Sequence, residues 1–281
     1  RQAGVRPFEV GYAGLKDRRA VTTQWFTVPA RRGGVQDWAG RAGEGYEILE
    51  AHRHTRKLPR GALAGNRFTL VLRGFTGSRE ALERRVAEIA VEGVPNYFGP
   101  QRFGRELGNL AVLRGEPVRG ERGFAYSAAR SLIFNAVLAE RLAAGHWNRL
   151  LPGERANLEG SNSTFRVEAI DETLRQRLAA LDIHPTGPLW GEGESGVTGE
   201  VAELESSVAS RYPALLELLR ADRLASARRP LRMVVRDLAL RWLPEADACE
   251  LQFSLRGGSF ATTVVRELVH LDDATGAEEH A

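Results

Sequence analysis

A single carboxylate crowded by positive charge is the first feature of this sequence that could do chemistry. Asp17 is flanked by Lys16, Arg18 and Arg19, just after a Gly-x-x-Gly turn at residues 11–14. Burial raises the pKa of a carboxyl group by up to roughly 3–5 units, whereas one cation about 4 Å away acts in the opposite direction. Asp17 can therefore stay ionised in a cleft, and an ionised, held aspartate can act as a nucleophile. The alternative is a turn aspartate in a surface ion pair, worth about 0–1 kcal/mol.

The lysine beside Asp17 indicates a specific need for that kind of charge. Of the 39 basic residues, only Lys16 and Lys57 are lysines. Arginine therefore serves wherever a generic positive charge suffices. Lysine at position 16 indicates a compact point charge that the planar guanidinium group of arginine cannot replace.

Charge is distributed unevenly along the chain. Residues 1–73 carry 14 Lys or Arg and 6 Asp or Glu, a balance of +8, whereas the remainder carries 25 against 30, a balance of −5. This segregation indicates a polyanionic partner for the first part. Its densest basic cluster is residues 52–60 (HRHTRKLPR), which is either a solvated loop or a set of phosphate contacts. Together with the Asp17 cluster, it favours phosphate contacts.

Composition excludes several classes of protein. With 281 residues and 43% hydrophobic content, the chain has the make-up of a soluble globular protein of one or two domains. No apolar run approaches the ~18 residues of a membrane span, and no signal-peptide pattern is visible. The single cysteine, Cys249, cannot form an internal disulfide and fits a reducing cytoplasm. Because the sequence opens at Arg1 rather than at methionine, we expect it to be part of a longer protein.

No cofactor or metal site can be argued from the residues. The six histidines show no metal-ligand spacing with Cys249. No Gly-x-x-x-x-Gly-Lys phosphate loop is present in the sequence. We therefore expect a reaction that uses neither.

Residue patterning predicts strands, then helices, then strands again. The expected strands are residues 24–28, 46–52, 67–73, 231–243 and 249–255. The expected helices run from Ser78 to Gly93, from Ser127 to Ala144, from Asp171 to before Pro185, over residues 200–226 with a break near Pro213, and from Ser259 onward. Residues 185–199 are Gly-rich and acidic and indicate a loop. This order predicts a helical insertion in a β-rich catalytic domain.

Three further segments carry side chains that could contact a ligand. Asn66 precedes a strand and is either a turn residue or a group that holds a ligand or orients Asp17. The glycines and serine at residues 257–259 are either an anion seat or a turn into a capped helix. Phe260 follows them as core or as a stacking platform for a base. The loop 94–104 interleaves aromatic and basic residues, as nucleic-acid sites and packed loop cores both do.

Four long blocks follow one another in a fixed order along the chain. They are residues 13–22 (AGLKDRRAVT), 58–70 (LPRGALAGNRFTL), 94–104 (VPNYFGPQRFG) and 257–268 (GGSFATTVVREL). Together these blocks resemble the TruD family of tRNA pseudouridine synthases. The resemblance spans the chain from its first dozen residues to about Leu268.

The resemblance implies roles for four residues. Asp17 would be the catalytic aspartate, and Asn66 and Phe260 would contact the target uridine. Phe68 would lie nearby in the same block as Asn66. From the charge pattern we also expect Lys16 in the substrate site, and Lys16 or Arg18 to keep the carboxylate charged. The implied substrate is uridine-13 of certain tRNAs, and the implied isomerisation needs no cofactor and no metal.

The resemblance also implies an α+β fold. A pseudouridine-synthase-type catalytic domain on a mixed or antiparallel sheet would comprise residues 1–92 and 235–281. A mainly helical α/β insertion domain would occupy residues 93–234. Family members carry an upstream segment that supplies an aromatic residue to the site, and no counterpart is visible in this sequence. We expect a cytoplasmic monomer that binds tRNA and no membrane.

Two other classes of function remain open from the residues alone. An RNA-binding protein without catalysis would use the same basic surface, and it would bind tRNA without modifying it. A hydrolase with an aspartate nucleophile would need a second carboxylate as general acid, and Glu9 is the other acid near Asp17 in sequence. Release of free uracil would identify the hydrolase. Whether Asp17 attacks the nucleotide covalently or abstracts a sugar proton is also open.

Overall fold

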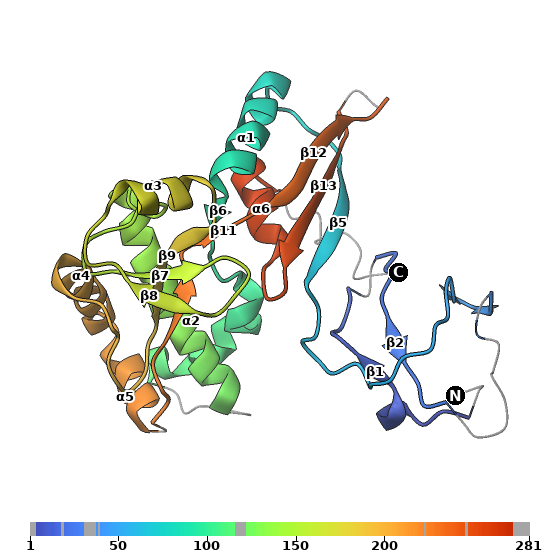
Figure 1. Cartoon of the computed structure of the whole chain (residues 1–281), viewed down its shortest axis with the longest axis horizontal. Helices are drawn as coiled ribbons and strands as arrows, with labels where there is room; N and C mark the ends of the chain where they lie inside the picture. The colour runs from blue at the N-terminus through green and yellow to red at the C-terminus, as the bar shows by residue number, and fades with distance from the viewer. Residues whose placement is uncertain are drawn as a thin grey trace. The chain divides into compact units, whose positions relative to one another are not determined.

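The chain divides into two compact units, Arg1–Asn66 (unit 1) and Arg67–Ala281 (unit 2). The structure, a computed structural model, describes residues 4–17, 20–30, 38, 40–115, 122–221, 223–244 and 247–271. Arg18 and Arg19 lie outside the described residues. Helices and antiparallel strands make up the fold, so the α+β expectation is confirmed (Figure 1). None of the helices in the described ranges is long and apolar enough to cross a membrane.

Unit 1 contains two short antiparallel hairpins. β1 (Gly11–Tyr12) pairs with β2 (Phe26–Thr27), and β3 (Ala42–Gly43) pairs with β4 (Tyr46–Glu47). The strands predicted at residues 24–28 and 46–52 are therefore present but shorter. Among the described residues of this unit, Val5 is the one buried hydrophobic side chain. Hydrogen bonds between chain segments, rather than an apolar core, define the arrangement of this unit.

Unit 2 begins with a three-stranded sheet of order β12-β13-β5. Its strands are β5 (Gly65–Leu72), which starts at the end of unit 1, β12 (Arg236–Trp242) and β13 (Cys249–Arg256). Every second residue of β13 is buried, as the alternation of its sequence predicts. These residues pack against α1 (Arg79–Glu92) and α6 (Ala261–Leu268) on one face of the sheet (Figure 1).

Helix boundaries next to this sheet follow the predicted caps closely. The Ser78 hydroxyl accepts a hydrogen bond of 3.1 Å from the Ala81 amide, and Gly93 ends α1 with a φ of +74°. Helix α6 begins at Ala261 rather than at Ser259, with Phe260 in the N-cap position and no side-chain cap. The sequence therefore predicted both helices, with a small shift at the start of the second.

The chain leaves this sheet at β6 (Val94–Pro95) and returns at β11 (Arg232–Met233), which pair antiparallel. The intervening residues form a four-stranded antiparallel sheet of order β10-β9-β7-β8. Its strands are β7 (Arg155–Leu158), β8 (Thr164–Arg166), β9 (Ile183–Leu189) and β10 (Ala227–Pro230). The helical elements are η2 (Pro100–Phe103), η3 (Arg105–Arg114), α2 (Arg122–Ala143), α3 (Glu172–Ala179), α4 (Gly199–Ser210) and α5 (Pro213–Ala221). This part has its own buried clusters, separate from that of the three-stranded sheet.

Strand β9 corrects the prediction of a loop over residues 185–199. Pro185 and Pro188 have no amide hydrogen, and proline is uncommon in central strands. The carbonyl groups of this strand accept hydrogen bonds from arginine side chains of other elements. These bonds reach Ile183 from Arg232 (2.9 Å), Thr186 from Arg228 (2.8 Å) and Leu189 from Arg130 (2.8 Å). Side-chain donors from elsewhere in the chain are invisible to local patterning.

Helix α2 corrects a second prediction, because it starts at Arg122 and not near Ser127. Ser127 lies inside the helix, where its hydroxyl accepts a 2.9 Å hydrogen bond from Arg102. The predicted stop at Gly145 is confirmed by its φ of +69°. The predicted cap at Asp171 is confirmed by a 2.8 Å bond from the Leu174 amide. The predicted break at Pro213 is also confirmed, since α5 begins there.

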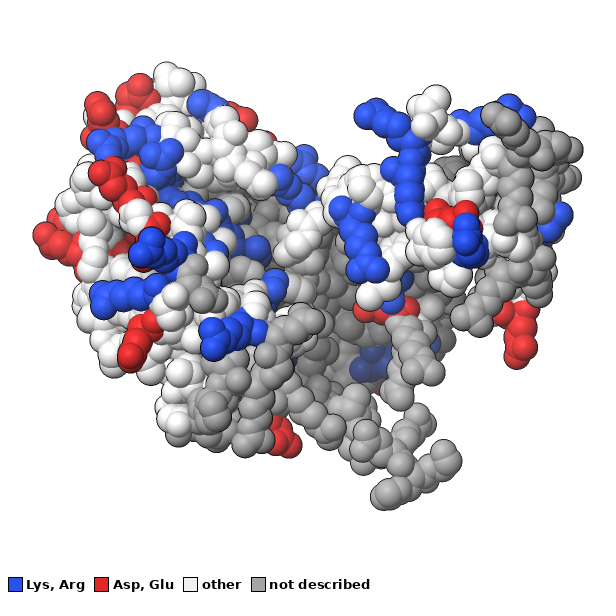
Figure 2. Space-filling view, turned by 90° about the horizontal axis from the view of Figure 1, so that it is seen from below, with Lys and Arg blue, Asp and Glu red and all other residues white. Residues whose placement is uncertain are grey.

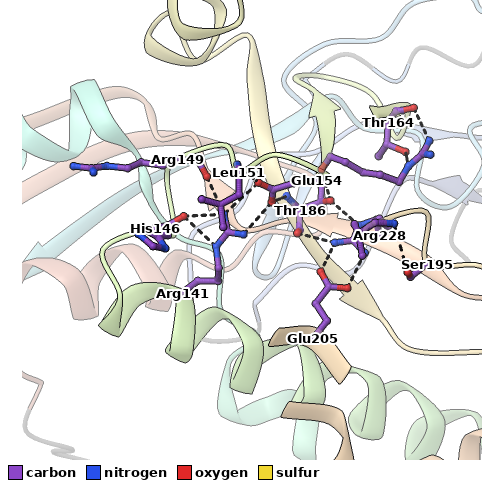
Figure 3. A network of polar contacts seen from close by, with 12 residues as sticks. Arg141, His146, Arg149, Leu151, Glu154, Thr164, Thr186, Ser195, Glu205 and Arg228 are labelled. Carbon is purple, nitrogen blue, oxygen red and sulfur yellow. Dashed lines mark hydrogen bonds and ion pairs between the residues drawn. The ribbon is translucent and has the colours of Figure 1, made fainter. Parts of the chain in front are cut away.

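Two buried ion pairs lie between α2, α4 and the four-stranded sheet (Figure 3). Arg141 and Glu154, 2% and 0% exposed, approach to 3.3 Å. Arg228 donates to Glu205 at 3.0 Å. Thr186 joins the pairs, because its amide donates to Glu154 at 3.2 Å and its carbonyl accepts from Arg228 at 2.8 Å. Burial raises the pKa of Glu154, and the Arg141 cation opposes that rise.

Replacement of Arg141 by methionine should destabilise the protein by about 3–5 kcal/mol, because Glu154 would be left as an unpaired buried charge. Unfolding by urea, followed by circular dichroism, measures this loss. Arg175→Met is the matched control, since Arg175 is 61% exposed and pairs within α3 with Glu172. A loss no larger for Arg141→Met than for Arg175→Met would contradict the role of the buried pair.

A buried histidine connects the two sheets of unit 2. His184 of β9 is fully buried; its Nδ1 accepts from Arg232 at 2.9 Å and its Nε2 lies 2.9 Å from Glu159. Because a guanidinium group occupies Nδ1, the imidazole is neutral and its Nε2–H donates to Glu159. Arg236 of β12 donates to the same carboxylate at 2.8 Å.

The pKa values of His184 and Glu159 are both lowered in this environment. Burial, followed by the Arg232 charge, lowers the pKa of His184 below its usual value of 6.5. The hydrogen bond from His184, followed by that from Arg236, lowers the pKa of Glu159 to about 2 against the opposing effect of burial.

Stability should therefore fall as pH decreases below about 6.5, because the unfolded chain binds a proton at His184 more readily than the folded chain does. Glu159 should add a second loss between about pH 4.5 and 2. Unfolding free energies measured from pH 5 to 8 test the first part. His184→Gln should flatten the dependence in this range, and His270→Gln, at an exposed position, should preserve it. Equal profiles for the two variants would refute the assignment.

Candidate active site

Asp17 lies in the connection between β1 and β2. Lys16 and Asp17 are both exposed on unit 1. Among the described residues, the Asp17 carboxylate makes no hydrogen bond or ion pair, so it is free to meet a substrate. Of the three cations next to Asp17 in sequence, Lys16 donates to Asn66, and Arg18 and Arg19 lie outside the described residues.

A second segment, residues 57–66, runs alongside the segment that leads to Asp17. Five hydrogen bonds tie it to residues 8–27. They are Lys57 Nζ to the Phe8 carbonyl (2.7 Å), Leu58 N to Thr27 Oγ1 (2.9 Å), Arg60 Nη2 to Tyr12 Oη (2.5 Å), Gly61 N to the Ala13 carbonyl (2.6 Å) and Lys16 Nζ to Asn66 Oδ1. Four of these contacts advance in the same direction along both segments. Two of the four sequence blocks are therefore neighbours in space.

Gly11 permits this close approach. A Cβ atom at position 11 would collide with Thr27 Oγ1 and would lie only 2.6 Å from the Leu58 carbonyl oxygen and 2.8 Å from Lys57 Cγ. By contrast, a Cβ at Gly14 would meet no atom within 4 Å. The glycine of this turn that packing requires is therefore the first one.

Asn66 and Lys16 are in direct contact. The Lys16 ammonium group donates to Asn66 Oδ1. This contact orients the amide and leaves its Nδ2 hydrogens available to a substrate carbonyl or to a carboxylate. The other lysine, Lys57, also donates across the unit, to the Phe8 carbonyl. Both lysines therefore have structural partners about fifty positions away.

The two aromatic candidates lie in unit 2 in different surroundings. Phe68 projects from β5 onto Phe253, with ring centres 5.5 Å apart, in the core beneath the three-stranded sheet. Phe260 is partly buried at the start of α6 and packs against the cluster that contains Phe98 and Phe134. Both residues are therefore partly buried, Phe260 against the cluster around α2 and Phe68 against that of the three-stranded sheet.

The basic segment 52–60 has a divided role. Lys57 and Arg60 hold it against β1, as described above, and Arg60 also lies 5.0 Å from the centre of the Tyr12 ring. Arg53 and Arg56 are exposed. The structure therefore gives half of this segment a structural role and leaves these two arginines to solvent.

The aromatic loop 94–104 is largely packed. Phe98 and Phe103 are buried in the cluster around α2, as the packing interpretation predicted. Sequence reasoning missed Arg229, whose guanidinium group lies 4.2 Å from the centre of the Phe98 ring and donates to Asn96 at 2.6 Å. Two arginines in a short strand give no local signal of which one makes such a contact.

Among the described residues, no group of three or more His, Cys, Asp and Glu side chains gathers where a metal ion could bind.

Comparison with solved structures identifies the fold. The crystal structure of a TruD protein from Methanosarcina mazei superposes with a TM-score of 0.68, at 21% identity, over 94% of this chain and 82% of that one. The architecture is therefore that of TruD, an α+β fold.

Comparison of sequences identifies the family. Residues 1–119 and 124–268 match the family tRNA pseudouridine synthase D (TruD). A tRNA pseudouridine synthase D from Methylococcus capsulatus is 47% identical over 279 residues, which cover 97% of this chain and 78% of the relative. Relatives of the same name from Nitrosococcus oceani and Pseudomonas aeruginosa are 46% and 45% identical, covering 98% and 96% of this chain and 79% and 78% of the relatives. The chain belongs to the TruD family of tRNA pseudouridine synthases.

Gly11→Ala should loosen the pairing of the two unit 1 segments, because overpacking costs about 1–3 kcal/mol. The amides of Leu58 and Gly61, which cross between the segments, should exchange their hydrogens about 5–100 times faster. Hydrogen exchange read by NMR or mass spectrometry measures this change. Gly14→Ala is the matched control and should leave both amides protected. Equal exchange in the two variants would show that the close approach at Gly11 is not required.

Proposed function

We propose that this protein converts uridine-13 of tRNA to pseudouridine, with Asp17 as the catalytic residue. Membership of the TruD family supports the reaction. The observation that carries the assignment of Asp17 is the contact between Lys16 and Asn66, which fixes the Asp17 segment against the second family block. Asp17 itself is exposed and unpaired among the described residues, so substrate can reach it.

The reaction is an isomerisation. The N1–C1′ bond of uridine breaks, the uracil turns, and C5 bonds to C1′; C5 then loses its proton and N1 gains one, so the composition of the nucleotide is unchanged. Asp17 starts this sequence, either by attacking the nucleotide or by removing a sugar proton. Extrusion of the base from the RNA stack costs a few kcal/mol. Neither the isomerisation nor the extrusion of the base requires a chemical group other than those of the protein and the RNA.

Each remaining candidate has a role suited to its surroundings. Asn66, oriented through its oxygen by Lys16, donates from Nδ2 to the uracil edge or to the Asp17 carboxylate. Lys16, next to Asp17 in the chain, joins the substrate site through its contact with Asn66. Phe260 stacks on the extruded base, and Phe68 holds the strand that follows Asn66 through its contact with Phe253.

We further propose the domain division 1–92 and 235–281 for catalysis and 93–234 for the insertion. The pairing of β6 with β11 supports these boundaries, because the chain leaves and re-enters the first sheet there. The separate buried clusters on either side of this pair support them as well. A cytoplasmic location accords with the buried free thiol of Cys249.

Asp17→Asn should lower pseudouridine formation by at least about a thousandfold, since the amide keeps the shape of the side chain but cannot act as nucleophile or base. The affinity for tRNA should change little. Chemical mapping of pseudouridine in tRNA incubated with the protein measures the activity, and a filter-binding assay measures the affinity. Undiminished activity of Asp17→Asn would refute the assignment.

The same assay separates the rival functions. Glu9→Gln is the matched control, because Glu9 is held in a local ion pair with Arg6 at 3.3 Å. Glu9→Gln should retain full pseudouridine formation. A hydrolase with Glu9 as general acid would instead release uracil, and Glu9→Gln would abolish that release. Binding of tRNA by the unaltered protein without any pseudouridine would identify a non-catalytic binder. Pseudouridine at another position of the tRNA would contradict the assignment to uridine-13.

A further inference from the structure

Three arginine side chains lie along one stripe of α2. Arg130 belongs to the helix itself. Arg102 reaches Ser127 through a 2.9 Å hydrogen bond, and the guanidinium group of Arg229 lies 5.7 Å from the centre of the Phe134 ring. Positions 127, 130 and 134 are spaced by three and four residues, so they share one face of the helix. We call Arg102, Arg130 and Arg229 the arginine stripe.

Two of these cations share one aromatic ring. The guanidinium groups of Arg229 and Arg102 lie 4.2 Å and 5.1 Å from the centre of the Phe98 ring. Each cation is attracted to the ring, but the two repel one another. Burial, followed by the Arg102 charge, lowers the pKa of Arg229 to about 10. Both side chains remain cationic near pH 7, so this repulsion persists in the free protein.

The arginine stripe also has unused hydrogen-bond donors. The Nε–H groups of all three side chains are buried and have no hydrogen-bond partner. Within the described part of the chain, none of the three guanidinium groups contacts a carboxylate. Other deeply placed arginines of this part have their donors engaged, since Arg141 pairs with Glu154, Arg228 pairs with Glu205, and Arg232 donates to His184 and to two carbonyl groups. Unpaired charge and unsatisfied donors together are the properties of an anion site without its anion.

The stripe is partly buried and packs near a candidate substrate residue. Arg102, Arg130 and Arg229 are each of intermediate exposure, and their Nε atoms are buried. Phe260 packs against the same buried cluster as Phe98 and Phe134. Many other Lys and Arg side chains of the described residues lie at the surface, as Figure 2 shows.

We propose that Arg102, Arg130 and Arg229 form a phosphate-binding site that holds the tRNA backbone next to Phe260. This inference rests on the proposed function, because tRNA is the polyanion that the enzyme must hold. Guanidinium groups match phosphate oxygens with paired donors, and a phosphodiester would relieve the repulsion between Arg102 and Arg229. The site would position the backbone and would carry no sequence preference.

Arg102→Gln tests this proposal by salt-dependent binding. Glutamine can still donate to Ser127 but carries no charge. Affinity for tRNA should fall about tenfold near physiological salt, and the slope of log K against log salt should decrease in magnitude by about 0.7–0.9 for each lost phosphate contact. Arg211→Gln is the matched control, because Arg211 is 54% exposed and pairs with Glu140 at 2.5 Å. The control removes the same charge and should preserve both quantities.

A second variant guards against misfolding. Arg229→Lys keeps the charge but removes the planar donor group, and it should weaken tRNA binding with little change in the salt slope. Thermal unfolding of each variant establishes that it is folded. Salt slopes for Arg102→Gln and Arg211→Gln that agree with that of the unaltered protein would overturn the proposal, as would full affinity in a folded Arg229→Lys variant.

Two further outcomes separate this site from other possibilities. Stabilisation by inorganic phosphate that Arg102→Gln abolishes, with unchanged tRNA binding, would identify a site for a free anion and overturn the assignment to RNA. Loss of pseudouridine in Asp17→Asn together with normal tRNA binding by Arg102→Gln would refute the stripe and leave the proposed function intact. Conversely, an inactive unaltered protein whose tRNA binding depends on Arg102 would support the stripe and refute the catalytic proposal.

Discussion

The close approach of two backbones at Gly11 is the constraint on which the candidate site depends. Unit 1 has little buried apolar surface among its described residues, so packing cannot fix the position of its loops. Contact between Gly11 and the segment at Leu58 places the following residues in register, ending at Lys16 and Asn66. A side chain at position 11 would push these segments apart. The orientation of the Asn66 amide therefore depends on the absence of a methyl group some distance away.

Arginine side chains also fix the backbone in the part of unit 2 between β6 and β11. Strand β9 contains two prolines, and arginine side chains from three other elements donate to its carbonyl groups. Where a carboxylate is also present, as at Glu154 and Glu205, these cations belong to closed internal networks (Figure 3). Around Phe98, Arg102 and Arg229 keep buried Nε groups without a hydrogen-bond partner. Arg232 has no carboxylate partner among the described residues either, but His184 and two carbonyl groups accept its hydrogen bonds. Unsatisfied donors therefore distinguish the arginines suited to an external anion.

Local patterns predicted the parts of the fold that local forces determine. Ser78, Asp171 and Gly145 mark helix ends because caps act within one turn, and β13 alternates because one of its faces is buried. Strand β9 and the start of α2 were predicted wrongly. In β9 two prolines obscure the strand pattern while arginines from other elements donate to its carbonyl groups, and in α2 Ser127 accepts a bond from Arg102 rather than capping the helix. Such contacts join residues far apart in sequence and leave no local trace.

The residues of the candidate site were likewise predictable from the sequence only where they belong to local motifs. Asp17, Lys16 and Asn66 stand in motifs dense enough to identify from the sequence, and the structure adds the bond between the last two. Arg229 belongs to no recognisable motif. Its contact with Phe98 depends on the position of β10 in the fold and could not be predicted from the sequence.

The scarcity of lysine has a practical consequence. The two primary amines on side chains, at positions 16 and 57, both connect the segment that carries Asp17 or precedes it to residues about fifty positions away. Acylating reagents that consume free amines would therefore report on those bridges alone, apart from the chain terminus. The extent of labelling at Lys16 and at Lys57 would therefore measure how often each of these two hydrogen bonds is broken.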